Sequence, residues 1–194
     1  MPELPTTPRG NATSRRILEA AREEFAARGI AGARIDRIIT AARTNKAQLY
    51  GYFGSKDGLF DAVIADCVAG FTNAVPFDVN DLPGWAVGLY DENLCRPDMV
   101  RLITWFRLER RPAGVISSDA EPGDLAKLDD IAKAQAAGRL RPGNPFDLLT
   151  LIIAMACAWS PASGIYTATA DEPAADHERR RALLRDCVHR AVAP

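Results

Sequence analysis

Apolar residues recur at helical spacing along almost the whole chain, and this periodicity constrains the fold more than any other feature. It begins with Ile17, Leu18, Ala21 and Phe25, whose spacing places them on one face of a helix. Similar stripes follow, and no alternating strand pattern of useful length competes with them. The sequence therefore predicts an all-α fold.

Glycine, proline and cap-forming residues divide this pattern into separate helices. Asn45 and Ser55 are suited to begin helices, and Gly29 and Gly138 to end them. Several prolines also stand where a first helical turn is expected. The predicted helical segments carry the apolar stripes of residues 17–25, 35–42, 46–53, 55–71, 83–89, 97–106, 125–131, 145–159 and 173–191.

The composition excludes several classes of protein. A chain of 194 residues, with 47% hydrophobic residues and a formal net charge of −1, is expected to be globular. Its four cysteines form no C-x-x-C pair, so we expect reduced thiols and neither a metal site nor another cofactor. The longest apolar run, residues 148–159, is shorter than the roughly 20 residues that a bilayer span needs, and the N-terminus lacks the apolar run of a signal peptide. We therefore expect a cytoplasmic protein with no membrane partner.

The charge is unevenly distributed along the chain. Residues 1–60 hold ten Lys and Arg against six Asp and Glu, whereas the remaining residues hold fourteen against nineteen. A basic N-terminal part with a net charge of +4 thus precedes an acidic part with a net charge of −5. This asymmetry favours an anionic partner for the N-terminal part alone.

The stretch NKAQLYGYFGSK, from Asn45 to Lys56, indicates what that partner is. A helix that begins at Lys46 places Leu49 and Phe53 on one face and Lys46, Ala47, Tyr50 and Gly51 on the opposite side. The small residues allow a close approach, and the lysine and tyrosine supply hydrogen-bond donors. A short helix at 35–42 precedes it, so the pair matches a helix-turn-helix that reads the major groove of double-stranded DNA.

At these residues the sequence resembles the TetR family of bacterial transcriptional repressors. The positions in register with the family pattern are Ile35, Ile38, Ala42, Leu49, Tyr50, Phe53, Lys56 and Leu59, and the resemblance covers roughly residues 13–64. The sequence departs from the pattern in the turn, where the usual Ala-Gly-Val-Ser is replaced by residues 42–45, Ala-Arg-Thr-Asn. Arg34 stands where a capping threonine is common, and Ile39 replaces a small alanine.

The resemblance implies roles for individual residues. Tyr50, Tyr52 and Lys56 would donate to phosphates, and Lys46 and Ala47 match positions that touch base edges. The whole predicted DNA-binding set is Arg34, Thr44, Asn45, Lys46, Ala47, Gln48, Tyr50, Gly51, Tyr52 and Lys56. Three alternatives stay open: Tyr52 also suits packing beside Phe53, Lys56 a solvated surface, and Gln48 the closing of its own helix end in a capping box.

The resemblance also implies two domains, a DNA-binding domain at 1–60 and an all-helical ligand-binding and dimerisation domain at 61–194. The second domain has no sharp motif. Its candidates for an effector pocket are Trp85, Tyr90, Trp105, Phe106 and Trp159, although aromatic residues at helical spacing equally suit a core. The helices at 148–159 and 183–191 are expected to form a homodimer interface that includes Leu184.

The predicted function is that of a ligand-responsive transcriptional regulator. It would repress transcription by binding a palindromic operator as a homodimer and would be released by a small molecule of unknown identity. The alternative is a helical interaction protein of the same fold that has lost operator binding, which only the irregular turn favours. An enzyme is not expected, because His177 and His189 lack spaced ligand partners and no nucleophile motif or phosphate-binding glycine loop is present.

Overall fold

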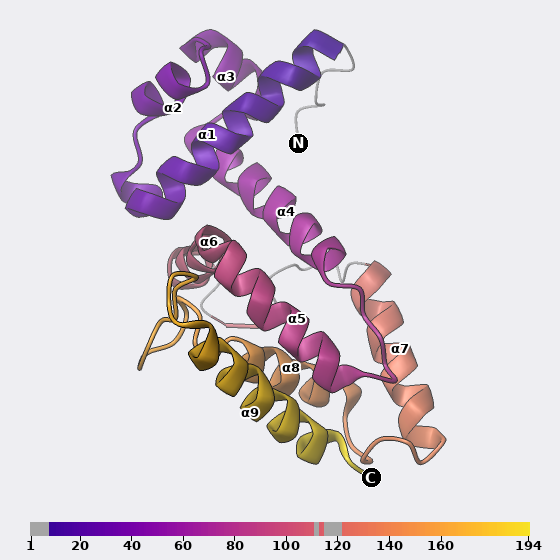
Figure 1. Ribbon diagram of the computed structural model, residues 1–194. Helices are drawn as coiled ribbons and strands as arrows, with labels where there is room; N and C mark the ends of the chain where they lie inside the picture. The colour runs from indigo at the N-terminus through magenta and orange to yellow at the C-terminus, as the bar shows by residue number, and fades with distance from the viewer. Residues whose placement is uncertain (1–7, 111–112, 115–121) are drawn as a thin grey trace. The chain divides into compact units, whose positions relative to one another are not determined.

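The computed structural model describes residues 8–110, 113–114 and 122–194 (Figure 1). Every regular element in these residues is an α-helix, which confirms the predicted fold class. The helices are α1 (Pro8–Gly32), α2 (Ile35–Ala41), α3 (Lys46–Phe53), α4 (Lys56–Ala74), α5 (Leu82–Cys95), α6 (Pro97–Glu109), α7 (Pro122–Ala136), α8 (Pro145–Ala156) and α9 (Ala174–Val192). Within the described ranges, no helix has both the length and the apolar character needed to cross a membrane.

The helices form two compact units, which divide the chain differently from the boundary predicted after residue 60. The N-terminal unit comprises Met1–Gly70 and Arg101–Ala113, and the C-terminal unit comprises Phe71–Val100 and Gly114–Pro194. The predicted boundary lies inside α4, which belongs to the N-terminal unit as far as Gly70. That unit also includes α6 from Arg101 onward, a segment that the sequence had placed in the ligand-binding domain.

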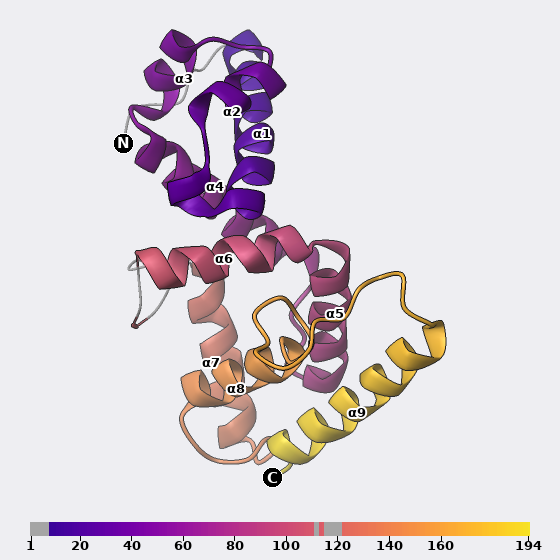
Figure 2. The same cartoon turned by 90° about the vertical axis from the view of Figure 1, so that its left-hand side faces the viewer.

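The N-terminal unit is built around the apolar stripe of α1. Helix α1 packs against both α2 and α3, which lie side by side (Figure 2). Phe25 of α1 is fully buried and meets Phe60 of α4 edge to face, with 5.1 Å between the ring centroids. Phe106 of α6 stacks on the same Phe60 ring at 6.2 Å. This aromatic cluster therefore packs α1, α4 and α6 together. Helices α2 and α3 are positioned on this core by their packing against α1.

Gly29 is a kink within α1 rather than its end. Its backbone has φ of 65° and ψ of 178°, and the helix resumes as far as Gly32. A Cβ built on Gly29 would lie 3.2 Å from the nearest ring atom of Trp105. Both the backbone conformation and the approach of the indole ring therefore require a glycine here.

The C-terminal unit has its own core, in which α5 packs against α8 and α9, and α7 packs against α8. Leu82, Leu89, Ile152 and Val188 are buried members of this core. Leu184, expected at the dimer interface, is only 2% exposed and belongs to the same core. That expectation was wrong because α9 turns Leu184 toward α5 and α8, whereas its neighbour Leu183 is 52% exposed.

Candidate nucleic-acid interface

The turn between α2 and α3 closes although it lacks the usual glycine. Arg43 takes the left-handed conformation there, with φ of 50°. Its amide donates to the Thr40 carbonyl at 3.2 Å, and the Thr44 amide donates to the Ile39 carbonyl at 3.0 Å. These are the two bonds that normally end a helix on a left-handed glycine. The irregular turn therefore gives no support to the alternative of a lost DNA-binding motif.

The N-terminus of α2 is satisfied by a side chain from α1. Arg34 has extended backbone and no side-chain cap bond, but its amide donates to Glu24 Oε1 at 3.0 Å. Arg37 donates to the same carboxylate, with 2.6 Å between its Nη2 and Glu24 Oε1. The Arg37 hydrogen bond, aided by the Arg34 amide, lowers the pKa of Glu24. Glu24 thus replaces the missing capping residue, a role that the sequence pattern did not reveal.

Helix α3 begins at the predicted cap. Asn45 Oδ1 accepts the Gln48 amide at 2.9 Å. The reciprocal half of the predicted capping box is different, because the Gln48 side-chain oxygen accepts a bond from the Thr44 hydroxyl at 2.6 Å. Leu49 and Phe53 are buried, as predicted. The first turn of α3 is therefore tied to the preceding turn by the side chains of Thr44 and Asn45, which both bond Gln48.

The outward side of α3 carries small and hydrogen-bonding groups. Lys46, Ala47, Gln48, Tyr50 and Gly51 are all exposed. A Cβ built on Gly51 would meet no atom within 4 Å, so the helix surface is open there. The exposed residues and the open space at Gly51 leave room for a partner to approach this side of the helix.

Lys46 is held toward α2 by an acid that the sequence reading had not singled out. Its Nζ lies 2.9 Å from Asp36 Oδ1, in the first turn of α2, and this contact raises the pKa of Lys46. Both side chains are exposed, so the pair contributes little stability. Its effect is to direct Lys46 toward the first turn of α2.

The start of α4 is closely fitted to the end of α3. The Gly58 amide donates to Ser55 Oγ at 2.9 Å, which confirms Ser55 as a cap. A Cβ built on Gly58 would lie 2.3 Å from the Phe53 carbonyl oxygen, so only glycine fits. Lys56, the first residue of α4, is half-buried at this junction. It stands at the positive end of a helix, which is a favourable site for an anion.

The predicted DNA-binding residues thus fall into two groups. One group is exposed: Arg34 at the start of α2, Asn45 at the cap of α3, and Lys46, Ala47, Gln48, Tyr50 and Gly51 on α3. The other group, Thr44, Tyr52 and Lys56, is half-buried. The Tyr52 ring meets Phe53 edge to face at 6.2 Å, in agreement with the packing alternative. Packing of the ring leaves the role of its hydroxyl group open.

The five aromatic residues predicted for a ligand pocket belong to two different units. Trp85, Tyr90 and Trp159 belong to the C-terminal unit, where Tyr90 and Trp159 meet edge to face at 5.8 Å. Trp105 and Phe106 belong to the N-terminal unit, against Gly29 and Phe60. The sequence could not separate the two groups, because all five occupy similar positions on apolar helix faces.

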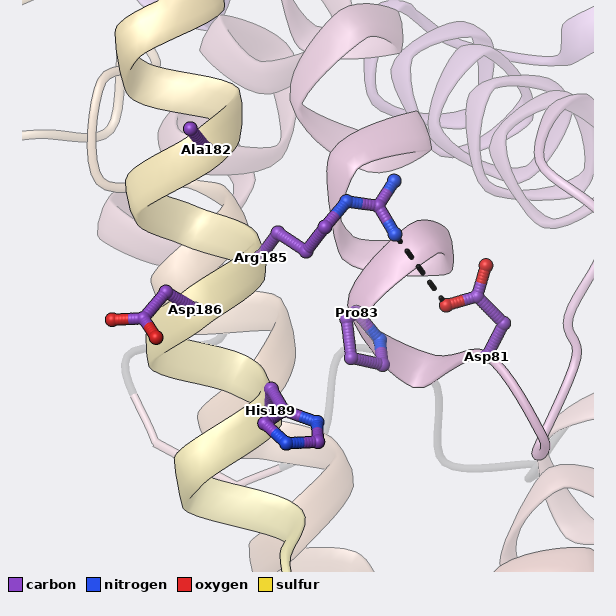
Figure 3. Close-up of a pocket in the computed structure, with 6 residues that line it drawn as sticks. All are labelled: Asp81, Pro83, Ala182, Arg185, Asp186 and His189. Carbon is purple, nitrogen blue, oxygen red and sulfur yellow. Dashed lines mark ion pairs between the residues drawn. The ribbon is translucent and has the colours of Figure 1, made fainter.

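A hollow of about 480 Å³ lies between the start of α5 and the outer side of α9 (Figure 3). Arg185 and Asp81 face each other across it, with 3.7 Å between Nη1 and Oδ1. Its lining residues are Asp81, Pro83, Ala182, Arg185, Asp186 and His189. None of the predicted aromatic residues is among them, so this charged hollow is not the predicted pocket.

The described residues also contain polar groups that the sequence reading missed. Asn93, His177 and Arg180 are buried close to Tyr90 in the C-terminal unit. Asn93 and Tyr90 are one turn apart on α5, and His177 and Arg180 are one turn apart on α9. Such spacing is also typical of solvated helix faces, so it gave no signal. The same described ranges hold no group of three or more His, Cys, Asp and Glu that suits a metal ion.

Comparison with known proteins gives matches to both parts of the chain. Residues 17–63 match the model described as bacterial regulatory proteins, tetR family, and residues 81–190 match the model described as tetracyclin repressor-like, C-terminal domain. The chain is 39% identical over 148 residues to the HTH-type transcriptional repressor SCO4008 of Streptomyces coelicolor, covering 75% of this chain and 77% of that protein. It is also similar to the HTH-type transcriptional repressor NicS of Pseudomonas putida, with 43% identity over 58 residues, 30% of this chain and 27% of that one. Among solved structures, the transcriptional regulator SCO4942 from Streptomyces coelicolor has a TM-score of 0.75 and 38% identity, covering 93% of this chain and 98% of that one.

Proposed function

This chain belongs to the TetR family of bacterial transcriptional regulators, and from that premise we propose that it represses transcription by binding a palindromic operator as a homodimer. Members of the family are regulators rather than enzymes, and they bind operator DNA, typically as dimers, with small-molecule effectors. We further propose that a small molecule bound in the C-terminal unit releases the DNA. This function places the protein in the cytoplasm, where operator DNA is found.

The outward side of α3 is the observation that carries the proposal. Ala47 and Gly51 would allow the helix backbone to approach the floor of a major groove. Lys46 and Gln48, which contact Asp36 and Thr44 in the free protein, would exchange these contacts for base edges. Leu49 and Phe53 face the opposite way and are buried, so contact with DNA does not disturb the core. One face of α3 is thus available for DNA, and the opposite face packs in the core.

Phosphate contacts are expected at the edges of this surface. Tyr50 is exposed beside the small residues, and Lys56 stands at the N-terminus of α4. Arg34, Thr44, Asn45 and Tyr52 flank them, although the Asn45 and Thr44 side chains already bond Gln48. These residues would fix the position of α3 on the duplex without selecting its sequence.

The homodimer is expected to form through α8 and α9. Leu151 and Ile153 of α8 and Leu183 of α9 are exposed, which is unusual for large apolar side chains at several positions of one region. A two-fold contact between these helices would bury them in a four-helix arrangement. To read a palindrome, such a dimer must present two copies of α3 about 34 Å apart, on successive turns of one face of the duplex.

The effector is expected to contact the aromatic residues of the C-terminal unit, Trp85, Tyr90 and Trp159. Trp105 and Phe106 pack in the N-terminal unit and are better suited to support the helix-turn-helix. Because α4 and α6 each contribute residues to both units, either helix provides a continuous path from an effector to α3. A ligand acts through such a path only if it favours one arrangement of the units over another.

A gel-shift experiment with DNA from the region upstream of the protein's own gene tests the proposal. The variant Ala47→Glu should abolish binding, because it brings a carboxylate against bases and phosphates. The matched control Ala132→Glu adds the same charge at an exposed alanine of α7 and should bind like wild type. Equal melting temperatures show that both variants are folded. Unchanged binding by a folded Ala47→Glu variant would refute α3 as the reading helix.

A further inference from the structure

Four polar side chains of the neighbouring helices α5 and α9 are buried in the C-terminal unit. Tyr90 and Asn93 of α5 are 1% and 5% exposed, and His177 and Arg180 of α9 are 6% and 8% exposed. The two helices lie side by side in both ribbon views (Figures 1 and 2). We call these four residues the polar cluster. Buried groups of this kind normally have all their hydrogen bonds satisfied.

The hydrogen bonds of Tyr90 determine whether the Nε2 atom of His177 is a hydrogen-bond donor or an acceptor. The Arg180 guanidinium interacts with Tyr90, which raises the pKa of Arg180, and a guanidinium has only donors, so the Tyr90 oxygen is the favoured acceptor. Tyr90 Oη lies 2.7 Å from His177 Nδ1, and for this reason we assign the tyrosine hydroxyl as the donor of that bond. A neutral histidine that accepts at Nδ1 carries its own proton on Nε2. His177 Nε2 is therefore a hydrogen-bond donor.

Three atoms of the cluster have no hydrogen-bond partner in the structure: His177 Nε2, Arg180 Nη1 and Asn93 Oδ1. The first two are donors. The third is an acceptor, because Asn93 Nδ2 donates to the Ala156 carbonyl at 3.4 Å and so fixes the orientation of the amide. Two donors and one acceptor without partners, buried around one tyrosine, indicate a place for a guest with complementary groups.

The charges around the cluster decide whether that guest is an ion. Arg180 Nη2 lies 2.7 Å from Glu172 Oε2, and Arg181 Nη2 lies 2.7 Å from Asp91 Oδ1. The Thr169 amide and Arg180 lower the pKa of Glu172 to about 2, so this carboxylate stays ionised at neutral pH. Each arginine is thus already balanced, and an anionic guest would add an unbalanced charge beside two carboxylates.

We propose that the polar cluster binds a neutral small molecule, whose carbonyl oxygen accepts from His177 and Arg180 and whose hydroxyl or N–H group donates to Asn93. Trp159, half-buried and edge-on to Tyr90, offers an apolar face for the body of this molecule. The proposal rests on the proposed function in identifying this molecule with the effector. It names the chemical class that the effector belongs to.

The loop of residues 160–173 covers the cluster on the side of α9. Tyr166 lies under the Arg180 guanidinium, 5.3 Å from its ring centroid, and donates to Glu172 at 3.0 Å. The Ala168 amide donates to the Trp159 carbonyl at 2.8 Å, which ties the loop to the end of α8. Displacement of this loop would open a path from solvent to the cluster. Binding there would consequently alter the junction of α8 and α9, where the dimer contact is expected.

Two simple probes distinguish a neutral guest from an anion. Benzamide carries a carbonyl acceptor and an N–H donor on an aromatic ring, whereas benzoate has the same size but is charged and has no donor. The chain contains two histidines, and His189 is exposed, so it serves as an internal reference. Titrations of the full-length protein are followed by the ¹H–¹³C signals of the imidazole rings, assigned with His177→Gln.

Benzamide should shift the His177 signal in a saturable way and leave that of His189 unchanged. Benzoate should bind about tenfold more weakly, and Asn93→Leu should weaken benzamide about fivefold by removing its acceptor. Equal binding of benzoate would overturn the assignment of a neutral guest. Absence of a saturable shift with benzamide would show that water alone occupies the cluster. The gel-shift experiment is independent of these titrations. If DNA binding fails while benzamide binds, the proposed function as a regulator is refuted and the proposed binding site at the polar cluster is retained.

Discussion

Gly29→Ala provides the sharpest test of how the helix-turn-helix is supported. With φ of 65° and ψ of 178°, this residue lies in a region of backbone conformations that is essentially restricted to glycine. The added methyl group would also lie 3.2 Å to 3.3 Å from three atoms of the Trp105 indole. Carbon atoms in favourable contact are about 3.5–4.0 Å apart, so the ring must move by a few tenths of an ångström.

The two effects have different magnitudes. Backbone strain at such a position costs about 1–3 kcal/mol, and displacement of the tryptophan adds a smaller amount. For a chain of this length, a loss of 1 kcal/mol lowers the melting temperature by about 2–4 °C. We therefore expect Gly29→Ala to melt about 2–12 °C below wild type.

Thermal and urea unfolding, with the tryptophan fluorescence and the helical circular dichroism followed together, measure this loss. Gly32→Ala is the matched control, because it lies in the same helix, its Cβ would make an ordinary contact at 3.4 Å, and it should stabilise by about 0.5–1 kcal/mol. In a Trp105→Ala background, the cost of Gly29→Ala should fall to that of the backbone strain alone. If Gly29→Ala is as stable as Gly32→Ala, the kink and its contact with α6 are wrongly described.

Three further predictions concern DNA, assembly and pH. Asp36→Asn releases Lys46 and removes a negative charge next to the phosphates, so binding to non-specific DNA should tighten and its salt slope should steepen by up to about one unit, measured by fluorescence anisotropy; an unchanged slope would contradict this geometry. Leu183→Glu should give folded monomers in analytical ultracentrifugation, whereas Leu184→Glu should unfold the C-terminal unit, because only the second side chain is buried; folded dimers of Leu183→Glu would refute the interface. The pKa of Glu172 is depressed to about 2, so its stabilising contribution is complete above pH 4.5 and is lost as the pH falls toward 2. In Glu172→Gln, the free energy of unfolding should therefore depend less on pH between 4.5 and 2. An unaltered pH dependence would contradict the ion pair between Glu172 and Arg180.

The helix pattern and the faces of α3 could be predicted because both depend on local spacing. Leu49 and Phe53 are separated by one turn, so any helix at this point buries them together. The assignment of α6 could not be predicted in this way. Trp105 of α6 packs against Gly29 of α1, which is far away in the sequence. The apolar stripe of a helix does not specify which of the two cores the helix joins. The predicted pocket was divided for the same reason.

The turn at Arg43 shows how a motif can lose its most characteristic residue and keep its geometry. A left-handed conformation costs a residue with a side chain about 1–2 kcal/mol more than glycine. The Thr40 and Ile39 carbonyls are nevertheless satisfied by the amides of Arg43 and Thr44, and Asn45 at once begins the next helix. Because Ile38 and Leu49 are fully buried on either side, the packing of both helices against α1 fixes their separation and leaves the turn no other path. The core on each side, more than the residue in the turn, therefore determines the orientation of α3, the helix that we propose reads DNA.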